Sequence, residues 1–263
     1  MSLSTYITQP RKALAITQPS EHIFFLSHMR AYSSLFGHIM GSHPQISGYY
    51  ELHIGYHSWK SLIRQKMLFF QEEEPKPKCR YMFDKVLHND HHVAPHLLNT
   101  DKTKAIFSLR DPVKTIPSIM ALYAKEDPTH EFNDAEFSTH YYIDRAEELV
   151  SLASKMDREY FYFDAEVMTQ QTDECLGRLS QWLNLSSPLS SSYSVQKKTS
   201  MSRYGDTSET LKSGKIELNK SKSTPFQLTP DLSQAATEAY MRCREALANS
   251  TSASCLNITS FMV

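Results

Sequence analysis

A short polar segment between two apolar stretches holds the residues best suited to bind an anion. Arg30, Ser33 and Ser34 follow the apolar run 23–26 and precede the amphipathic segment 35–40. The order strand, turn and helix aims backbone N–H groups and the positive end of a helix dipole at one point. Arginine adds a fixed charge and two parallel donors. The segment predicts a phosphate or sulfate site; a buried β-turn-α unit with a surface arginine is the alternative.

The segment does not have the pattern of a nucleoside-triphosphatase loop. That pattern is Gly-x4-Gly-Lys-Ser/Thr, and both glycines and the lysine are missing here. The anion would therefore be held by arginine, hydroxyl groups and backbone rather than by a phosphate-binding lysine.

A second candidate anion site comes later in the chain. Arg110 stands just past the apolar run 104–109, and Ser118 follows eight residues later, in the first turns of an expected helix. A guanidinium combined with a hydroxyl at a helix start is again suited to phosphate. The alternative is that Arg110 makes a structural ion pair with Asp111 or another acid.

The elements that must position these residues follow from periodicity and helix-stop signals. We predict strands over 22–26, 80–83, 104–109 and 160–163, and helices over 33–41, 59–70, 115–124, 137–155, 172–183 and 232–248. The third helix should begin near Thr115, because Pro117 is tolerated in a first turn. Strands that alternate with helices favour an α/β fold with a central parallel sheet in three layers. Arg30, Lys85 and Arg110 would then all lie beyond the carboxyl ends of strands, where ligands bind.

The chain divides into three parts on this reading. Residues 1–20 are expected to form a loosely held arm, 21–250 a single α/β domain, and 251–263 a tail. Residues 184–230 are rich in Ser, Lys and Thr and predict a long loop of the lid or binding type.

The two anion motifs together resemble the sulfotransferases that use 3′-phosphoadenosine 5′-phosphosulfate (PAPS). In that family an Arg-Ser-Gly-Ser/Thr-Ser/Thr loop holds the 5′-phosphosulfate, and a later Arg-Asp-Pro with a Ser eight residues after the Arg holds the 3′-phosphate. The resemblance spans about residues 22–215 and implies a P-loop-like sulfotransferase fold, with PAPS as donor and adenosine 3′,5′-bisphosphate as product. It implies cofactor contacts from Arg30, Ala31, Tyr32, Ser33, Ser34, Arg110 and Ser118.

One departure from the family pattern concerns the first loop. Ala31 replaces the usual serine and Tyr32 replaces the glycine, which supplies φ freedom and allows close approach. Tyr32 must either accept an ordinary backbone conformation or reshape the pocket.

The resemblance also suggests the catalytic residues. Lys85 takes the position of the family lysine that contacts the transferring sulfuryl group, where a cation stabilises charge on the bridging oxygen. Glu51, 21 residues after Arg30, resembles the base of some branches, including the tyrosyl-protein ones. His88, three residues after Lys85, resembles the histidine base of the cytosolic branch with its spacing off by one. Glu51 is preferred, and both remain candidates.

Two further groups of residues bear on nucleotide binding and on metal binding. Lys212, Gly214 and Lys215 resemble the C-terminal family loop that closes over the nucleotide, with a flexible basic loop as the alternative. Histidines also cluster between positions 88 and 96, but Pro95 interrupts a helical stack and no acid or cysteine has a zinc-like spacing. No metal is therefore expected.

Composition limits the remaining choices. A net charge of −1 gives no case for nucleic acid, and no run approaches the length of a membrane span. Four scattered cysteines and the lack of an apolar leader favour a reducing, cytoplasmic setting. The expected function is sulfuryl transfer to a hydroxyl or amine of a small-molecule or lipid-like acceptor. The alternatives are a small-molecule kinase of the related fold, with Asp164 holding magnesium, and a non-catalytic binder of the bisphosphate nucleotide or of a sulfated ligand.

Overall fold

A parallel sheet forms the centre of the computed structural model, which describes residues 9–198, 209–216 and 225–257. Within those ranges the sheet has six strands in the order β2-β3-β1-β4-β5-β6, and every neighbouring pair is parallel. The strands are β1 (Glu21–Leu26), β2 (Ile46–Ser47), β3 (Tyr81–Val86), β4 (Thr103–Leu109), β5 (Phe161–Asp164) and β6 (Ala253–Cys255). The predicted α/β fold with a central parallel sheet is confirmed.

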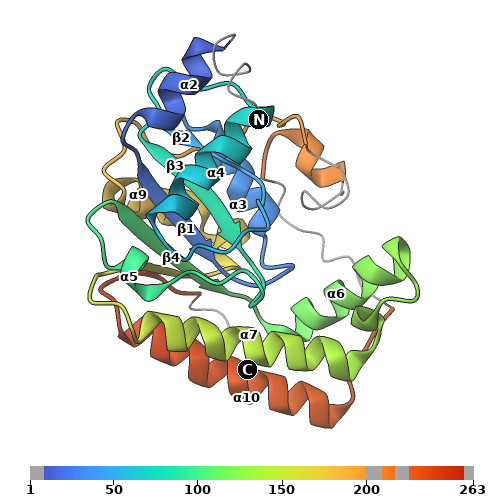
Figure 1. Cartoon of the computed structure of the whole chain (residues 1–263). Coiled ribbons are helices and arrows are strands. Elements are labelled where there is room, and N and C mark those ends of the chain that lie inside the picture. The colour runs from blue at the N-terminus through green and yellow to red at the C-terminus, as the bar shows by residue number, and fades with distance from the viewer. Residues whose placement is uncertain (1–8, 199–208, 217–224, 258–263) are drawn as a thin grey trace.

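Both faces of the sheet are buried, because successive side chains of each strand enter opposite cores. Phe24 and Leu26 of β1 join one core, whereas Ile23 and Phe25 join the other. Helices α6 (Pro112–Glu126), α7 (Ala135–Ala153) and α10 (Pro230–Asn249) cover the first face, and α7 and α10 lie side by side there (Figure 1). Helices α3 (Ser33–Ser42) and α9 (Thr172–Trp182) cover the second.

The remaining helices lie toward the β2–β3 edge of the sheet or are short. Helix α4 (Trp59–Glu72) packs against α2 (Pro10–Thr17), and the short elements are α5 (Pro95–Leu98), α8 (Val167–Gln170), η1 (Glu131–Asn133) and η2 (Glu209–Ser213). Within the described ranges, every helix is too short or too polar to cross a bilayer.

Several expected boundaries differ from the structure. The strand expected over 80–83 runs over Tyr81–Val86 instead, so Lys85 lies within β3 rather than beyond its end. Helix α6 begins at Pro112 rather than near Thr115, because the Asp111 side chain accepts from the Val113 N–H at 2.9 Å and Pro112 suits a first turn. Pro117 therefore lies inside the helix. The capping by Asp111 therefore decides where the helix starts, and the interior Pro117 does not prevent it from forming.

Described residues of the expected arm and tail take part in secondary structure. Residues of the expected arm form α2, which is tied to α4 by an ion pair between Lys12 and Glu74 at 3.1 Å. Residues of the expected tail form β6, which extends the sheet beside β5 and buries Cys255. An apolar surface offered by the neighbouring element, rather than local periodicity, stabilises both.

A buried ion pair joins β5 to α10. Arg244 donates to both carboxylate oxygens of Asp164, at 2.8 and 2.6 Å, and the same carboxylate accepts from Tyr162 Oη and the Asn257 N–H. The Asp164 side chain is 1% exposed. Removing one partner of such a pair leaves an uncompensated buried charge.

We therefore expect Arg244→Ala to lower the free energy of unfolding by about 3–5 kcal/mol. The matched control is Arg242→Ala on the same helix, whose ion pair with Glu147 is exposed and should be worth less than about 1 kcal/mol. Urea unfolding of the two variants gives both values. Equal losses would contradict a structural role for the Asp164 pair.

Candidate functional site

The two predicted anion motifs meet at the carboxyl edge of the sheet. The loop after β1 carries Arg30, and the neighbouring strand β4 ends just before Arg110. Arg30 Nε donates to Ser118 Oγ at 3.0 Å, and Arg110 Nη1 donates to the Arg30 carbonyl at 2.6 Å. Three residues separated by up to 88 positions thus form one contact network at the start of α3 and α6.

Tyr32 does not take an ordinary backbone conformation. It has φ 55° and ψ 21°, in the left-handed region that glycine adopts readily, and it is the residue just before α3. Its ring lies against Arg110, with the guanidinium Cζ 4.3 Å from the ring centroid, and Arg110 Nη2 donates to Tyr32 Oη at 3.2 Å. The tyrosine therefore adds an aromatic wall to the arginine site.

The neighbouring loop residues are buried at the start of α3. Ala31 is 1% exposed, and Ser33 and Ser34 lie in the first turn of the helix. Their backbone N–H groups are among those that a helix start leaves for an anion. Arg30 also has a positive φ of 61°, so two residues of this loop, Arg30 and Tyr32, have left-handed backbone conformations.

The backbone around Arg110 is fixed from below. His28 Nε2 accepts from the Arg110 N–H at 3.0 Å, while His28 Nδ1 lies 2.8 Å from the Met29 carbonyl and donates to it. Tyr142 Oη donates to the Arg110 carbonyl at 2.7 Å. Burial lowers the pKa of His28 to about 3, so the ring stays neutral and keeps this acceptor role.

One donor of Arg110 is buried without a partner. The Arg110 Nε atom has no hydrogen-bond acceptor among the described residues. Arg110 makes its contacts to a carbonyl and a phenol, while Asp111, the acid suggested for a structural pair, caps α6 and lies 3.5 Å from Lys114. A buried, unsatisfied guanidinium donor is costly and is what an anion site offers before its ligand arrives.

Lys85 lies at the same edge, at the end of β3. Its side chain is buried and passes along α3, where a Cβ added at Gly37 would lie 3.6 Å from Lys85 Cδ. The same added Cβ would lie 2.2 Å from the Tyr49 carbonyl oxygen, so Gly37 is required for this close packing. The Lys85 side chain therefore lies beside α3, the helix that follows the Arg30 loop.

Both candidate bases lie near the segment that follows β3. Glu51 is buried, and its Oε1 accepts from the Leu87 N–H at 3.4 Å. His88 contacts the Tyr141 ring with centroids 5.5 Å apart. Burial lowers the pKa of His88 and the Glu51 carboxylate opposes that shift, so the two groups face one another.

The loop with Lys212, Gly214 and Lys215 is attached to the second face of the sheet. Gly214 has φ 70°, and its carbonyl accepts from the Tyr193 N–H at 2.8 Å. Tyr193 contacts His38 of α3 with ring centroids 5.8 Å apart. The neighbouring segments 199–208 and 217–224 lie outside the described residues, so nucleotide contacts of this loop stay a prediction.

Comparisons with solved structures identify the architecture. The structure matches the sulfotransferase domain from the curacin biosynthetic pathway with a TM-score of 0.56 and 14% identity, over 85% of this chain and 98% of that one. It matches the sulfotransferase domain from the Synechococcus PCC 7002 olefin synthase with a TM-score of 0.55 and 16% identity, over 85% and 96%. The chain has the sulfotransferase fold. No family model and no curated protein matches its sequence.

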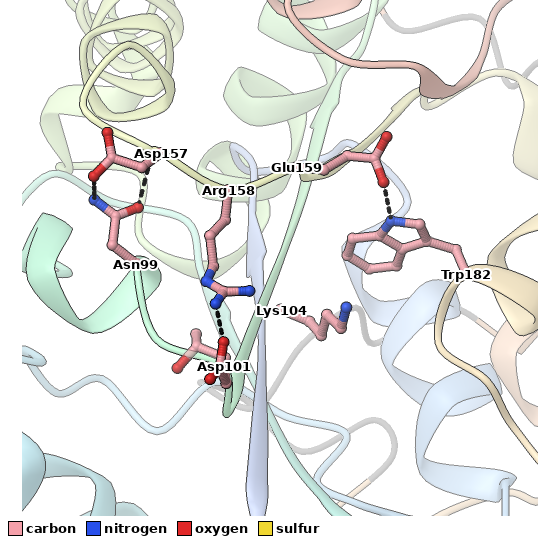
Figure 2. Close-up of a pocket in the computed structure, with 8 residues that line it drawn as sticks. Asn99, Asp101, Lys104, Asp157, Arg158, Glu159 and Trp182 are labelled. Atoms are coloured by element: carbon pink, nitrogen blue, oxygen red, sulfur yellow. Dashed lines mark hydrogen bonds and ion pairs between the residues drawn. The ribbon is translucent and has the colours of Figure 1, made fainter.

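The sulfotransferase fold places the polar hollow shown in Figure 2 at the opposite edge. This hollow of about 510 Å³ lies at the amino ends of β4 and β5. Polar groups that line it are paired with one another: Arg158 donates to Asp101, the Asp157 N–H donates to Asn99 Oδ1, and Trp182 Nε1 donates to Glu159. These partners leave the carboxyl edge as the better candidate for chemistry.

Asp84 was not predicted from the sequence. It positions the part of the site that holds Glu51 and His88, called the base side below. One oxygen of this buried carboxylate accepts from the N–H groups of Leu52 and Lys85, at 3.1 and 2.8 Å, and the other accepts from Tyr56 Oη. The carboxylate therefore fixes the segment after Glu51 against the end of β3. The available signal was an acid inside an otherwise apolar strand, Tyr-Met-Phe-Asp.

Burial raises the pKa of Asp84 from 3.8 to about 7. A folded-state pKa above the unfolded one means that stability is greatest below pH 4 for this group and is lost as pH rises to about 7. We expect the free energy of unfolding of Asp84→Asn to rise relative to that of the unsubstituted protein as pH increases through that interval. At higher pH the difference between the two proteins should stay constant. The buried histidines titrate in both proteins and cancel in the comparison.

Urea unfolding of both proteins at pH values between 4 and 8 measures this difference. Parallel stability curves across the whole interval would contradict the raised pKa.

Proposed function

We propose that this protein is a PAPS-dependent sulfotransferase that moves a sulfuryl group to a hydroxyl, or less favourably an amine, of a small-molecule or lipid-like acceptor. The observation that carries the proposal is the meeting of Arg30, Arg110 and Ser118 at one edge, with Arg110 Nε buried and unpartnered. The sulfotransferase fold supports the reaction class. PAPS as donor is inferred from the two anion motifs.

The residues at the carboxyl edge fit a donor with two separated phosphate groups. The loop at Arg30 and the start of α3 would hold the 5′-phosphosulfate with backbone N–H groups and the arginine. Arg110 and Ser118 would hold the 3′-phosphate. Arg30 Nε donates to Ser118 Oγ at 3.0 Å, which supports the proposal that the two subsites adjoin and serve one nucleotide.

The proposed mechanism uses the side chains of Lys85, Glu51 and Asp84. PAPS supplies an activated sulfuryl group on a bridging oxygen. The ammonium of Lys85 would stabilise negative charge on that oxygen while the S–O bond breaks. Glu51 would accept the proton of the acceptor hydroxyl as its oxygen bonds to sulfur. Asp84 would keep both groups in place, since it binds the backbone beside each of them.

The kinase alternative loses its magnesium candidate. Asp164 is the acid that a kinase would need after a strand, and its carboxylate accepts from Arg244, Tyr162 and Asn257 inside the core. A carboxylate so engaged is a structural partner rather than a metal ligand.

Calorimetry with adenosine 3′,5′-bisphosphate tests the nucleotide site. We expect Arg110→Ala to weaken its binding by about 10–100-fold, because a charged hydrogen bond is worth about 1.5–3 kcal/mol. Binding of 5′-AMP, which lacks the 3′-phosphate, should not change. Lys114→Ala, which removes an exposed charge from the first turn of α6, is the matched control.

Several results would contradict this assignment. Equal binding of ADP and of the bisphosphate, or equal losses for 5′-AMP and the bisphosphate in Arg110→Ala, would remove the 3′-phosphate site. Tight bisphosphate binding without transfer of labelled sulfate across hydroxyl and amine acceptors would favour a non-catalytic binder.

A second pair of variants separates the candidate bases. We expect Glu51→Gln to lower kcat by about 10²–10⁴-fold, the usual contribution of a general base, without changing bisphosphate affinity. His88→Asn should cost much less. Transfer from ³⁵S-labelled PAPS measures both rates, and the reverse order of losses would make His88 the base.

A further inference from the structure

Glu51 is also part of a group of side chains that the sequence did not bring together. One carboxylate oxygen of Glu51 and one ring nitrogen each of His53 and His91 all lie within 4.8 Å of one another. We propose that these three residues form a binding site for a divalent transition-metal ion of the Zn²⁺ type, placed at the base side of the site.

The geometry is close to that of a three-ligand metal centre. His53 Nδ1 lies 3.8 Å from Glu51 Oε1, and the rings of His53 and His91 have centroids 5.5 Å apart. Zinc–nitrogen and zinc–oxygen bonds of about 2.0–2.2 Å place tetrahedral ligands about 3.4 Å apart. Small side-chain rotations therefore suffice, and both imidazoles are accessible because His53 is exposed and His91 is half-buried.

Backbone contacts below the cluster hold its two chain segments together. The Tyr56 N–H donates to the His92 carbonyl at 2.7 Å, and the Ala94 N–H donates to the Tyr56 carbonyl at 2.8 Å. Tyr56 is buried and is bound to Asp84. This bridge brings His53 beside His91 although they are 38 positions apart in the chain.

The donor set selects the class of ion. Two imidazole nitrogens with one carboxylate oxygen suit Zn²⁺, Fe²⁺ or Co²⁺, whereas Mg²⁺ and Ca²⁺ prefer oxygen ligands throughout. Three protein ligands leave further positions for water. The nearby cation Arg145 donates to the Ser27 and Val86 carbonyls, at 2.8 and 2.6 Å.

The site has a consequence for catalysis that depends on the proposed function. A carboxylate that binds a metal ion through its oxygen is a poorer proton acceptor. Occupancy by Zn²⁺ should therefore inhibit sulfuryl transfer, and the inhibition should disappear when His53 or His91 is replaced.

Cobalt is the probe of the binding site, because its visible absorption reports ligand number without any assay of turnover. In this test the full chain is to be titrated with Co²⁺ at neutral pH, and Zn²⁺ is then to be added as a competitor for the same site. We expect one ion per chain, with absorption typical of four or five ligands. His53→Ala and His91→Ala should each weaken binding by at least about tenfold, the scale of losses around metal sites.

Two neighbouring histidines supply matched controls. His57 and His92 stack on one another, with ring centroids 6.0 Å apart, and neither belongs to the three-ligand group. His57→Ala and His92→Ala should bind Co²⁺ as the unsubstituted chain does. Circular dichroism confirms folding, and asparagine replaces alanine at any position where the fold changes.

The outcomes separate the two proposals. Binding of one Co²⁺ that is lost in the His53 and His91 variants supports the metal site even if no transfer is ever detected. Absent binding, or binding that is equally strong in all variants, overturns the site even if the protein transfers sulfate. Zn²⁺ inhibition that persists in His91→Ala would overturn the link to Glu51.

Discussion

The site depends on one buried guanidinium that joins the ends of two strands. Arg145 of α7 donates to the Ser27 carbonyl after β1 and to the Val86 carbonyl at the end of β3, and its third nitrogen donates to Asn89. Buried carbonyls at a sheet edge need donors. The Val86 carbonyl accepts from the Ser27 N–H at 3.3 Å as well as from Arg145, and the Ser27 carbonyl accepts from Arg145. Arg145 thus adds a charged donor to both carbonyls and helps to fix the start of the Arg30 loop relative to Lys85 and His88.

Tyr141, one turn before Arg145 on the same helix, completes this support. Its hydroxyl accepts from the Met29 N–H and donates to the Leu87 carbonyl, both at 2.9 Å. Burial raises the pKa of Tyr141, so the phenol keeps its proton and can act in both directions. The anion loop and the segment after β3 are thus connected through helix α7 as well as through the direct pairing of β1 with β3.

The sequence was sufficient for the α/β fold, because alternating strands and helices follow from local periodicity, whereas the pairing of the two anion motifs was implied by the resemblance to sulfotransferases. A strand that ends just before an arginine puts that arginine at the carboxyl edge whichever way the sheet is ordered, so Arg30 and Arg110 were predictable. The cluster of Glu51, His53 and His91 was not, since it depends on the bridge between Tyr56 and the segment at Ala94. Local spacing at 88–96 pointed to a helical stack instead, which Pro95 excluded.

Tyr32 shows how a departure from a family pattern can be accommodated. A left-handed conformation costs a non-glycine residue about 1–2 kcal/mol. The ring contact with Arg110 returns about 0.5–2 kcal/mol, depending on burial. The two terms are of similar size, so the loop can keep its path without glycine. The phenol covers the guanidinium, because Arg110 Nη2 donates to Tyr32 Oη. If Arg110 binds the 3′-phosphate as proposed, nucleotide binding would exchange the Tyr32 hydroxyl for a phosphate oxygen at Nη2. Affinity at this site is therefore expected to depend on how readily that ring moves as well as on the charge of Arg110.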